Sequence, residues 1–491
     1  MEHFSHIIYS KTFWVNSMNI VIVGGGTAGW IAAYFISKSQ PNLHSITVIE
    51  SSKIGIIGAG EGSTGSLINL IEGRFFDSKI DLVDFMNKTD GTLKMGIMHR
   101  NWAKDKSDYF APLDTSPTGF ALNDYIFKYV FSKVGKEGMH ISSKIGLNYN
   151  QDNTDKIEAV HFDGHKVGQY FKNICINLGV IVKDTVVEDI SVDNNGYISY
   201  IITEDSEIIS GDLFIDCTGF SRKLMKAINV DWISKQDVLP MNTAMPFLLN
   251  YSNGDEIFPF TTATALSSGW MWSIPLKTRM GCGYVFDSRF ISKEEAKKEI
   301  EEYLQTDITP IKYIDFTSGY SEKFFSKNVL CLGLSSAFVE PLEATSIHNT
   351  IIQIAIFVNE CLSANIDSTF SKYNKEIYNK RITFLQELTV DFISLHYQGG
   401  RDDTPFWKYI KDNKIGTPWA LETVERARIK IPGYSSFEGM YGSFSIPLSN
   451  WIMAGLDIIT PKQAEEDLIS SGLYKVAEKE YGYFYNTFFS G

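Results

Sequence analysis

The sequence contains few cysteines and no cluster of basic residues. The five cysteines stand singly, with no Cys-x-x-Cys pair, at Cys175, Cys217, Cys282, Cys331 and Cys361. This pattern argues against a disulfide framework and a cysteine-based zinc site, and it favours a reducing compartment. The net charge of −13, without a long lysine or arginine run, argues against a surface for nucleic acid or for an anionic membrane.

Long apolar runs are also absent. No uninterrupted stretch reaches the roughly 20 residues of a membrane span, and residues 1–17 lack the apolar core and cleavage site of a signal peptide. We therefore expect no membrane segment and a cytoplasmic location. Hydrophobic content of 44% and charged content of 21% are typical of a folded globular protein. Its partners are expected to be small molecules or proteins.

A glycine-rich turn, Gly24 to Gly29, lies near the start of the chain. The β-branched run Asn19–Val23 precedes it, and apolar residues follow at helical spacing from Trp30 to Ser39, so strand, turn and helix come in the order of a dinucleotide-binding unit. A second strand ends at Glu50, about 20 residues further on, where a ribose-binding carboxylate is expected. A lone glycine turn is weak evidence, and Glu50 alone would be a solvated acid. Their spacing predicts a cofactor site made by Gly24, Gly26, Thr27, Ala28, Gly29 and Glu50.

Three further segments have small residues that let the backbone approach a ligand closely. They contain Gly60 and Glu61, then Asp216 and Gly219, and finally Gly333. Each could be an ordinary loop. Strands are predicted between residues 238 and 290, and mostly helix from 347 to about 395. Since no repeat or obvious linker interrupts the chain, we expect its halves to pack as one body.

Two tryptophans one residue apart, Trp270 and Trp272, stand in the segment Gly269–Pro275. One isolated tryptophan would be interpreted as a core aromatic. Together with the glycine turn, this W-x-W-x-I-P segment resembles the flavin-dependent halogenases, the tryptophan halogenase group in particular. The resemblance runs from about Met18 to Trp407, which is most of the chain.

The resemblance implies an α/β fold: an FAD-binding Rossmann-like fold of the GR2-type flavoprotein monooxygenase kind, with a β-rich substrate portion and a mostly helical C-terminal portion. We accordingly divide the chain into an N-terminal arm (1–17), an FAD-binding module with an inserted substrate sheet (18–345), and a mostly helical portion that closes the substrate site (346–491). Aromatic residues of that last portion, among them Tyr434, Phe437, Tyr441, Phe444 and Trp451, are expected to line the closure.

The resemblance also assigns catalytic roles. Lys94 matches the active-site lysine of the family, which passes electrophilic halogen to the substrate either by hydrogen-bonding hypohalous acid or as a haloamine. Taken alone, a lysine is usually solvated surface, but apolar neighbours indicate partial burial here. Glu343, in a Glu-Pro-Leu-Glu stretch, matches the family's general base; taken alone, it could simply cap the next helix.

The same comparison assigns a halide site and a barrier. The backbone N–H groups of Thr345 and Ser346 begin a predicted helix, and helix N-termini attract anions. Trp270 and Trp272 match the barrier that keeps the organic substrate away from the flavin. The chain departs from the family at four positions, Gly62, Gly65, Ala344 and Ser346. The last two leave the halide preference open.

The later histidines are interpreted as structural. His396 and Tyr397 match the family's helical portion and read as satisfied core residues. His99 and His348 have no cysteine or acid at ligand spacing, so no metal is predicted.

The resemblance predicts a two-component halogenase that takes reduced FAD (FADH2) from a separate flavin reductase. It would use oxygen and a halide ion, chloride or bromide, to make hypohalous acid and so halogenate a small aromatic substrate, indole-like or phenolic. A homodimer is one assembly open to it. The alternatives are a single-component flavin-dependent aromatic monooxygenase, suggested by Gly219-Phe220-Ser221-Arg222, and a flavin-binding interaction protein without chemistry. The tryptophan pair with Lys94 and Glu343 favours the halogenase.

Overall fold

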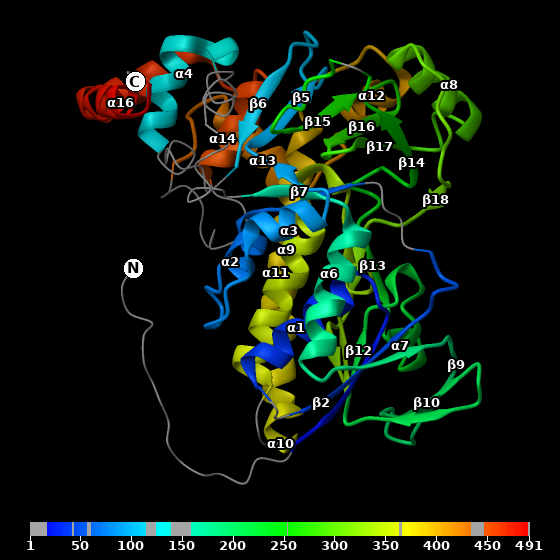
Figure 1. The fold of residues 1–491 in the computed structure, drawn as a ribbon. Coiled ribbons are helices and arrows are strands. Elements are labelled where there is room, and N and C mark those ends of the chain that lie inside the picture. The colour runs from blue at the N-terminus through cyan, green and yellow to red at the C-terminus, as the bar shows by residue number, and fades with distance from the viewer. Residues whose placement is uncertain are drawn as a thin grey trace.

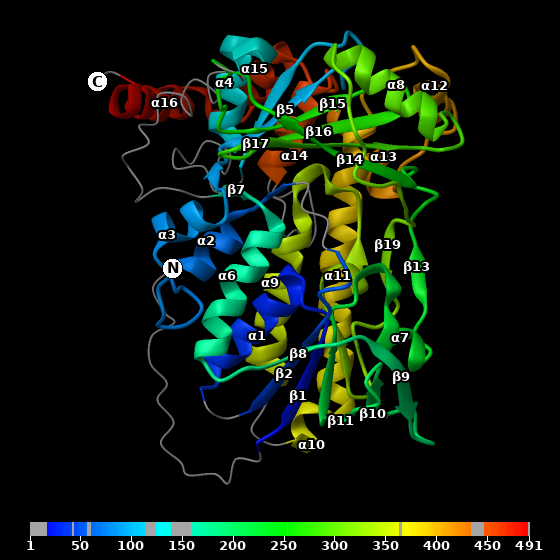
Figure 2. The same ribbon diagram turned by 45° about the vertical axis from the view of Figure 1, so that its right-hand side comes forward.

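The computed structural model describes residues 17–41, 44–55, 60–113, 124–138, 159–252, 254–362, 366–433 and 446–489. They form two stacked lobes, each built around its own sheet (Figures 1 and 2). Helix α11 (Lys372–His396) begins beside the sheet of the lower lobe and ends among the helices of the upper one. It therefore carries its last residues to the boundary between the lobes.

The lower lobe contains a six-stranded sheet in the order β20-β21-β12-β1-β2-β8, parallel except at the β20 edge. The central strands β1 and β12 are almost wholly buried, which fits their apolar sequences. Helix α1 packs against both α6 and α9. The elements are β1 (Asn19–Val23), β2 (Ser45–Glu50), β8 (Ile181–Asp184), β12 (Leu213–Asp216), β20 (Phe325–Ser326), β21 (Val329–Cys331), α1 (Thr27–Ser39), α6 (Gly164–Asn177), α7 (Lys223–Ala227) and α9 (Thr345–Ile356).

The upper lobe contains a seven-stranded sheet in the order β18-β14-β17-β16-β15-β5-β6. Two strands from early in the chain complete it, because β5 pairs in parallel with β15 and antiparallel with β6. The elements are β5 (Gly96–Arg100), β6 (Tyr109–Pro112), β14 (Thr243–Asn250), β15 (Thr261–Ala265), β16 (Gly269–Pro275), β17 (Arg279–Phe286), β18 (Ile314–Asp315) and the adjacent α8 (Lys293–Leu304).

The tryptophan segment forms strand β16 in the middle of this sheet. Side chains alternate between the two faces of a strand, so Trp270, Trp272 and Ile274 share one face and pack in one core cluster. Met271 lies on the other face, in the core that also contains Ile300 of α8. The alternation therefore turns both indoles to the same side of the sheet.

A small three-stranded sheet, β3-β7-β4, lies at the boundary between the lobes (Figure 1). It places the segments that precede β5 beside the loop that follows β2. Two more three-stranded sheets, β11-β10-β9 and β13-β19-β22, flank the lower lobe. The elements are β3 (Glu61–Gly62), β4 (Thr92–Leu93), β7 (Val160–Phe162), β9 (Val187–Val192), β10 (Ile198–Thr203), β11 (Ile208–Ser210), β13 (Trp232–Ser234), β19 (Gly319–Ser321), β22 (Ala337–Phe338), α2 (Gly65–Ile71) and α3 (Leu82–Lys88).

Helices of the C-terminal portion cover the upper sheet together with α4 (Asp124–Gly138), a helix from the first third of the chain. Helix α4 contacts α14, α15 and α16. The remaining helices are α10 (Ile366–Thr369), α12 (Pro405–Asp412), α13 (Pro418–Ala427), α14 (Ile446–Gly455), α15 (Pro461–Ser470) and α16 (Tyr474–Phe489). The division at residue 345 stays a prediction, and it falls at the start of α9.

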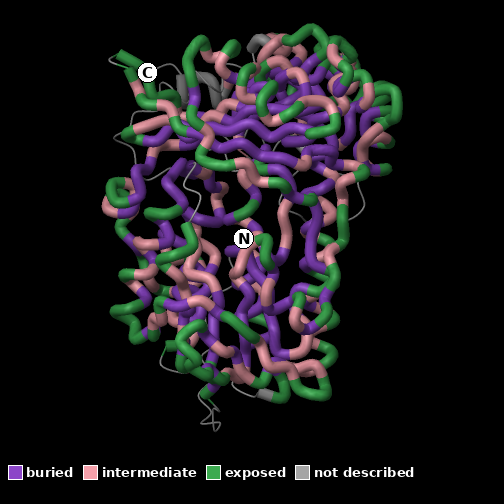
Figure 3. Tube along the Cα trace, turned by 90° about the vertical axis from the view of Figure 1, so that its right-hand side faces the viewer, coloured by how far each residue is buried: buried purple, intermediate pink, exposed green. Residues whose placement is uncertain are grey.

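The strands and helices predicted around the glycine turn and around the tryptophan pair are confirmed. The first strand has the predicted bounds, the first helix begins three residues earlier, at Thr27, and the stretch from 238 to 290 contains β14 to β17. The predicted helix from 347 to 395 is divided: α9 ends at Ile356, a π-helical turn follows at Phe357–Cys361, and α11 begins at Lys372. Figure 3 shows the buried chain running through both lobes.

None of the described helices is long and apolar enough to cross a membrane. All five cysteines are free thiols, four of them buried. Of the aromatic residues expected to close the substrate site, Tyr434, Phe437, Tyr441 and Phe444 lie outside the described residues, as does nearly all of the predicted arm. Trp451 lies in α14 and is buried against Phe127.

Candidate functional site

The glycine turn has the backbone geometry that a pyrophosphate site requires. Gly24 has a φ of +116°, a region that disfavours side chains, and a Cβ on Gly29 would lie 2.0 Å from the Gly24 carbonyl oxygen. Gly26, the N-cap of α1, is extended, with no side-chain cap, and a Cβ there would meet nothing within 4 Å. Gly24 and Gly29 are therefore fixed by the fold, whereas the space at Gly26 is free for a ligand on the helix N-terminus.

Glu50 ends β2 next to this turn, as predicted. A Cβ on Gly25 would lie 2.2 Å from that of Glu50. The carboxylate accepts a hydrogen bond from Trp30 Nε1 at 3.2 Å and forms an ion pair with Lys172 of α6. Sequence reasoning missed Lys172, which lies 122 residues away. The pair fixes the Glu50 carboxylate beside the glycine turn.

The other predicted cofactor segments lie near the same region but contribute differently. A Cβ on Gly333 would lie 2.7 Å from that of Ala28, so this loop touches the glycine turn. The Thr27 hydroxyl donates to the Gly164 carbonyl at 2.8 Å. Gly219 has a φ of +64° and open space at its Cβ position.

Asp216 builds a turn with its carboxylate. The two oxygens accept hydrogen bonds from the backbone N–H groups of Thr218, Leu224 and Met225. The side chain is fully buried, and burial raises its pKa against those hydrogen bonds. Asp216 therefore shapes the loop and the start of α7 rather than presenting a free carboxylate to a ligand.

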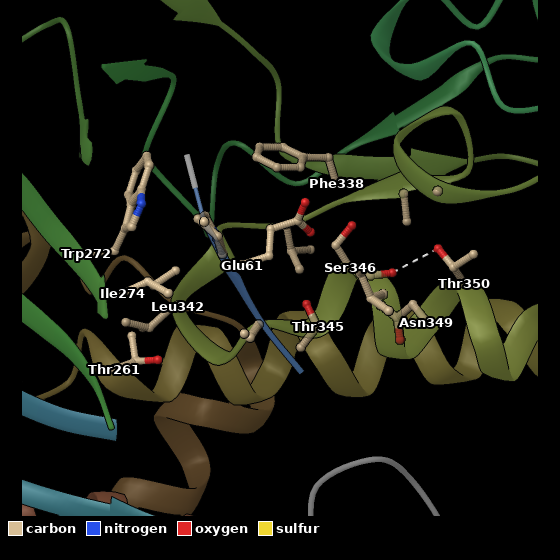
Figure 4. Close-up of a pocket in the computed structure, with 18 of the residues that line it drawn as sticks. Glu61, Thr261, Trp272, Ile274, Phe338, Leu342, Thr345, Ser346, Asn349 and Thr350 are labelled. Atoms are coloured by element: carbon tan, nitrogen blue, oxygen red, sulfur yellow. Dashed lines mark hydrogen bonds between the residues drawn. The ribbon is translucent and has the colours of Figure 1, made fainter. Parts of the chain in front are cut away.

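A cavity lies between the two lobes. Figure 4 shows Trp272, Ile274, Leu342 and Thr261 toward one end of it, and Ser346, Asn349 and Thr350 toward the other. Its lining comes from the boundary sheet, the upper sheet and the start of α9, and includes Gly60, Glu61, Gly62, Ile97, Trp270, Gly333, Phe338, Thr345 and Ser346. The mostly apolar lining suits a planar ring system.

Glu61 adds an acid to this wall. It lines the cavity and is mostly buried, and this burial, reinforced by the charge of Asp163, raises its pKa to about 7. The free space at Gly26, the carboxylate of Glu50 and the cavity together fit the adenosine, pyrophosphate and ring portions of FAD. The sequence prediction of a flavin site is therefore consistent with the geometry of these residues.

The two indoles are held in different ways. Trp270 Nε1 donates to Glu340 Oε2 at 3.1 Å, and the hydroxyl of Tyr397 donates to the same carboxylate oxygen. Glu340 is fully buried, which raises its pKa to about 7. Trp272 lies over its cross-strand partner Gly283, where a Cβ would be 2.0 Å from the ring. Both tryptophans line the cavity.

Lys94 directly follows strand β4 of the boundary sheet and is buried, with 1% of its surface exposed. Its Nζ donates to the Ser63 carbonyl at 3.0 Å. Burial lowers its pKa to about 8, and the negative charge of Glu343 acts in the opposite direction. A Cβ on Gly62 would lie 3.0 Å from this Nζ. The small residue at 62, one of the four departures from the family, thus leaves room for the ammonium group beside the cavity wall.

Glu343 ends a 3₁₀ turn, Pro341–Glu343, and is 7% exposed. Its Oε1 lies 2.9 Å from His396 Nε2 and 3.9 Å from His99 Nε2. The expectation that His99 has no acid at ligand spacing is therefore wrong, because ligand atoms of His99, Glu343 and His396 lie within 4.8 Å of one another. His396 and Tyr397 are buried as expected, but they contact Glu343 and Glu340, which sequence reasoning did not foresee.

The turn continues through Ala344, which has a φ of +53°, into α9. This helix has no side-chain cap, and its first residues, Thr345 and Ser346, line the cavity. The N–H groups of an uncapped helix start attract an anion. The predicted halide residues thus lie at the cavity, on the residues immediately after Glu343.

A parallel nucleotide-binding sheet, a cavity walled by indoles and a buried amine and carboxylate beside that wall define a flavoprotein of the oxidoreductase class. The sequence profile of the tryptophan halogenase family matches residues 19–466. The chain therefore belongs to the tryptophan halogenase family.

Individual relatives agree with this assignment. The tryptophan 6-halogenase SttH of Streptomyces toxytricini is 29% identical over 85% of each chain. Its crystal structure superposes with a TM-score of 0.81, at 27% identity over 96% of each chain. The tryptophan 7-halogenase RebH of Lentzea aerocolonigenes is 29% identical over 90% of this chain and 89% of its own. The structure of Xcc4156, a flavin-dependent halogenase from Xanthomonas campestris, has a TM-score of 0.79 at 26% identity, over 95% of this chain and 96% of its own.

Proposed function

We propose that this protein is a two-component halogenase that uses FADH2 from a separate flavin reductase to halogenate an electron-rich aromatic substrate, indole-like or phenolic. The observation that carries the proposal is the burial of Lys94 and Glu343 together beside the cavity that Trp270 and Trp272 line. An amine and a carboxylate in such a place suit the transfer of an electrophile followed by the removal of a proton.

When bound, reduced FAD supplies hypohalous acid from oxygen and a halide ion. The halide is proposed to sit on the backbone N–H groups of Thr345 and Ser346, at the uncapped start of α9. Trp270 and Trp272 exclude the organic substrate from the cavity, so that only a small oxidant passes.

Lys94 is proposed to receive the oxidant. Its lowered pKa means that a sizeable fraction of the amine is neutral near pH 8, and a neutral amine can accept halogen with release of water. The ammonium form can hydrogen-bond hypohalous acid instead. In both cases the halogen is aimed from Nζ at the substrate, and Glu343 accepts the proton that the aromatic ring then loses.

The test is an assay with reductase-supplied FADH2, oxygen, and chloride, bromide or iodide in turn, on a panel of indoles and phenols, with products read by mass spectrometry. We expect a halogenated product from at least one substrate. Glu343→Gln, which keeps the size of the side chain and removes its basicity, should lose most turnover while substrate still binds.

The monooxygenase alternative predicts a different outcome. A single-component enzyme would have its flavin bleached by NADPH without any reductase, and would give a hydroxylated product. Bleaching by NADPH alone, or hydroxylation without halogenation, would refute the two-component assignment.

A further inference from the structure

His396 and Glu343 meet at the boundary between the lobes, although they are 53 residues apart in sequence. His396 is the last residue of α11, and Glu343 ends the turn before α9. The imidazole is fully buried and the carboxylate 7% exposed. Their contact, 2.9 Å between Nε2 and Oε1, is therefore a buried hydrogen bond.

The other ring nitrogen of His396 determines where the protons are. Nδ1 lies 2.9 Å from the carbonyl oxygen of Phe392, one turn earlier in α11. A carbonyl oxygen only accepts, so Nδ1 must carry a proton. An ionised carboxylate also only accepts, so a second proton must lie between Nε2 and Oε1. The pair thus holds one proton more than a neutral histidine beside a free carboxylate.

The groups around this pair limit where the positive charge can reside. Burial, and then the charge of His396, lower the pKa of His99 well below its usual value, so His99 is neutral. Burial, and then the charge of Glu343, raise the pKa of Tyr109, which stacks on His99 at 4.6 Å and stays a neutral phenol. Lys94 is a further titratable neighbour of Glu343 among the described residues, and burial weakens its hold on its proton. His396 is therefore the cation that faces the carboxylate directly.

We propose that His396 is the positioning residue of Glu343: its imidazolium holds Oε1 with a charge-assisted hydrogen bond and leaves Oε2 to act as the base. This rests on the proposed function. During halogenation, the proton of the substituted ring carbon moves to Oε2, the electron pair of the C–H bond returns to the ring, and Nε2 keeps its own proton. Water then takes the proton from Oε2.

The first test is the pH dependence of turnover in His396→Gln. Glutamine can still donate one N–H to Glu343 but cannot carry a charge, so the variant keeps a hydrogen bond and loses the positive charge that faces the carboxylate. We expect the acid limb of kcat to move up by at least about one pH unit, with KM nearly unchanged. His44→Gln serves as control, because His44 is a partly buried histidine that contacts Gln40 just before β2; its profile should match the wild type. An unshifted acid limb in His396→Gln would overturn the proposal.

The second test does not depend on activity or on the folding of the His396 variant. With ¹⁵N-labelled histidine, NMR of the wild type should show one imidazole with both ring N–H groups at about pH 8, where an ordinary histidine is neutral. Glu343→Gln should remove this second N–H, because the partner charge is gone. A neutral His396 protonated only on Nδ1 in the wild type would overturn the proposal.

A bound metal ion is the competing occupant, since His99, Glu343 and His396 could ligate one. A metal on Nε2 of His396 would exclude the second proton, so treatment with EDTA would then change the NMR signals. Signals unchanged by EDTA are expected. If the wild type gives no halogenated product with any substrate, the proposed function fails while these NMR measurements still decide the protonation of the pair.

Discussion

The burial of Lys94 lowers the folding stability of the protein and also lowers the pKa of the amine. Among the described residues, the ammonium group has one hydrogen-bond acceptor, the Ser63 carbonyl, and it is almost fully buried. The interior therefore favours its neutral form, which is why the pKa falls from the usual 10.5 to about 8. Such a shift corresponds to about 3 kcal/mol of folding free energy.

We predict that Lys94→Met abolishes halogenation and stabilises the protein at neutral pH. Methionine fills a similar volume without a charge, so turnover should fall by about 100-fold or more while FAD binding stays the same. Because the unfolded chain binds the lysine proton more tightly than the folded one, the wild type gains stability as the pH rises from 8 to 10.5. The free energy of unfolding should therefore be measured by denaturation at several pH values. Below pH 8 the variant should be more stable than the wild type by up to about 3 kcal/mol, and this difference should disappear near pH 10.5. Substantial residual halogenation would contradict the role of Lys94.

At the scale of elements, the glycine turn separates folding from cofactor binding. Gly24 and Gly29 are in contact with each other, whereas Gly26 faces open space. Alanine at Gly26 therefore tests cofactor binding, whereas alanine at Gly29 tests folding.

We predict that Gly26→Ala folds normally but binds FAD poorly. Its φ of −75° suits alanine, and the added methyl group meets no protein atom, only the space for the pyrophosphate. FAD titration by fluorescence should show a loss of tenfold or more, about 1.4 kcal/mol, with an unchanged melting temperature of the apoprotein. Gly29→Ala, the matched control, should instead destabilise the apoprotein by about 2 kcal/mol or more, since its methyl group overlaps the Gly24 carbonyl. Equal FAD affinity in Gly26→Ala and the wild type would refute the assignment of this turn.

The barrier depends on two neighbouring strands, β16 and β17. Trp272 can lie flat against its neighbour because residue 283 has no side chain. We predict that Gly283→Ala displaces this indole into the cavity and lowers the product formed per reduced FAD by about tenfold or more, because small displacements in such sites are costly. Product and oxidised FAD, measured together in single-turnover reactions, would show the change. If Gly283→Ala forms as much product per reduced FAD as the wild type, the position of Trp272 does not affect this yield.

The elements with periodic patterns were predictable from sequence, but the contacts between them were not. The β-branched run before Gly24 and the alternation through Trp270 and Trp272 depend on local chemistry, so β1 and β16 were foreseen. Nothing local indicates that His396 faces Glu343, since α11 returns to the turn only after 53 residues. The ion pair of Lys172 with Glu50 was missed for the same reason.

At the scale of the whole molecule, the cofactor cavity joins the two lobes. Gly333 and Thr350 come from the lower lobe, whereas Thr261 and Trp272 come from the upper sheet. A ligand there contacts both, so its binding energy resists the separation of the lobes as well as their unfolding.

We predict that FAD at about 100 times its dissociation constant stabilises the entire protein by about 2.7 kcal/mol. Calorimetry should show the melting of both lobes moving together to higher temperature. Gly26→Ala at the same FAD concentration is the matched control and should show a smaller shift. A shift confined to one of two separate transitions would indicate that only one lobe contacts the cofactor.

The global arrangement was predictable only in part. The flavin-binding order of strand, turn and helix, and a single packed body, followed from sequence, because the first is a local pattern and the second needed only the lack of linkers. The packing of α4 on α14, α15 and α16 did not, because residues 124–138 lie far from the last helices in sequence and no local pattern pairs them. The division into modules at residue 345 remains a prediction.

Ala344 is a single left-handed residue between Glu343 and the start of α9 at the cavity. An alanine with a φ of +53° is held about 1 kcal/mol above its preferred backbone conformation. Heating should release this turn before the rest of the protein, and its release would separate Glu343 from His396 and disorder the first N–H groups of α9 together. Enzyme activity is therefore expected to disappear reversibly at a temperature below the melting temperature. Ala344→Gly adopts the same conformation without strain, so it should narrow the interval between the temperature of activity loss and the melting temperature. If this interval is unchanged in Ala344→Gly, the turn is not the first part of the protein to unfold.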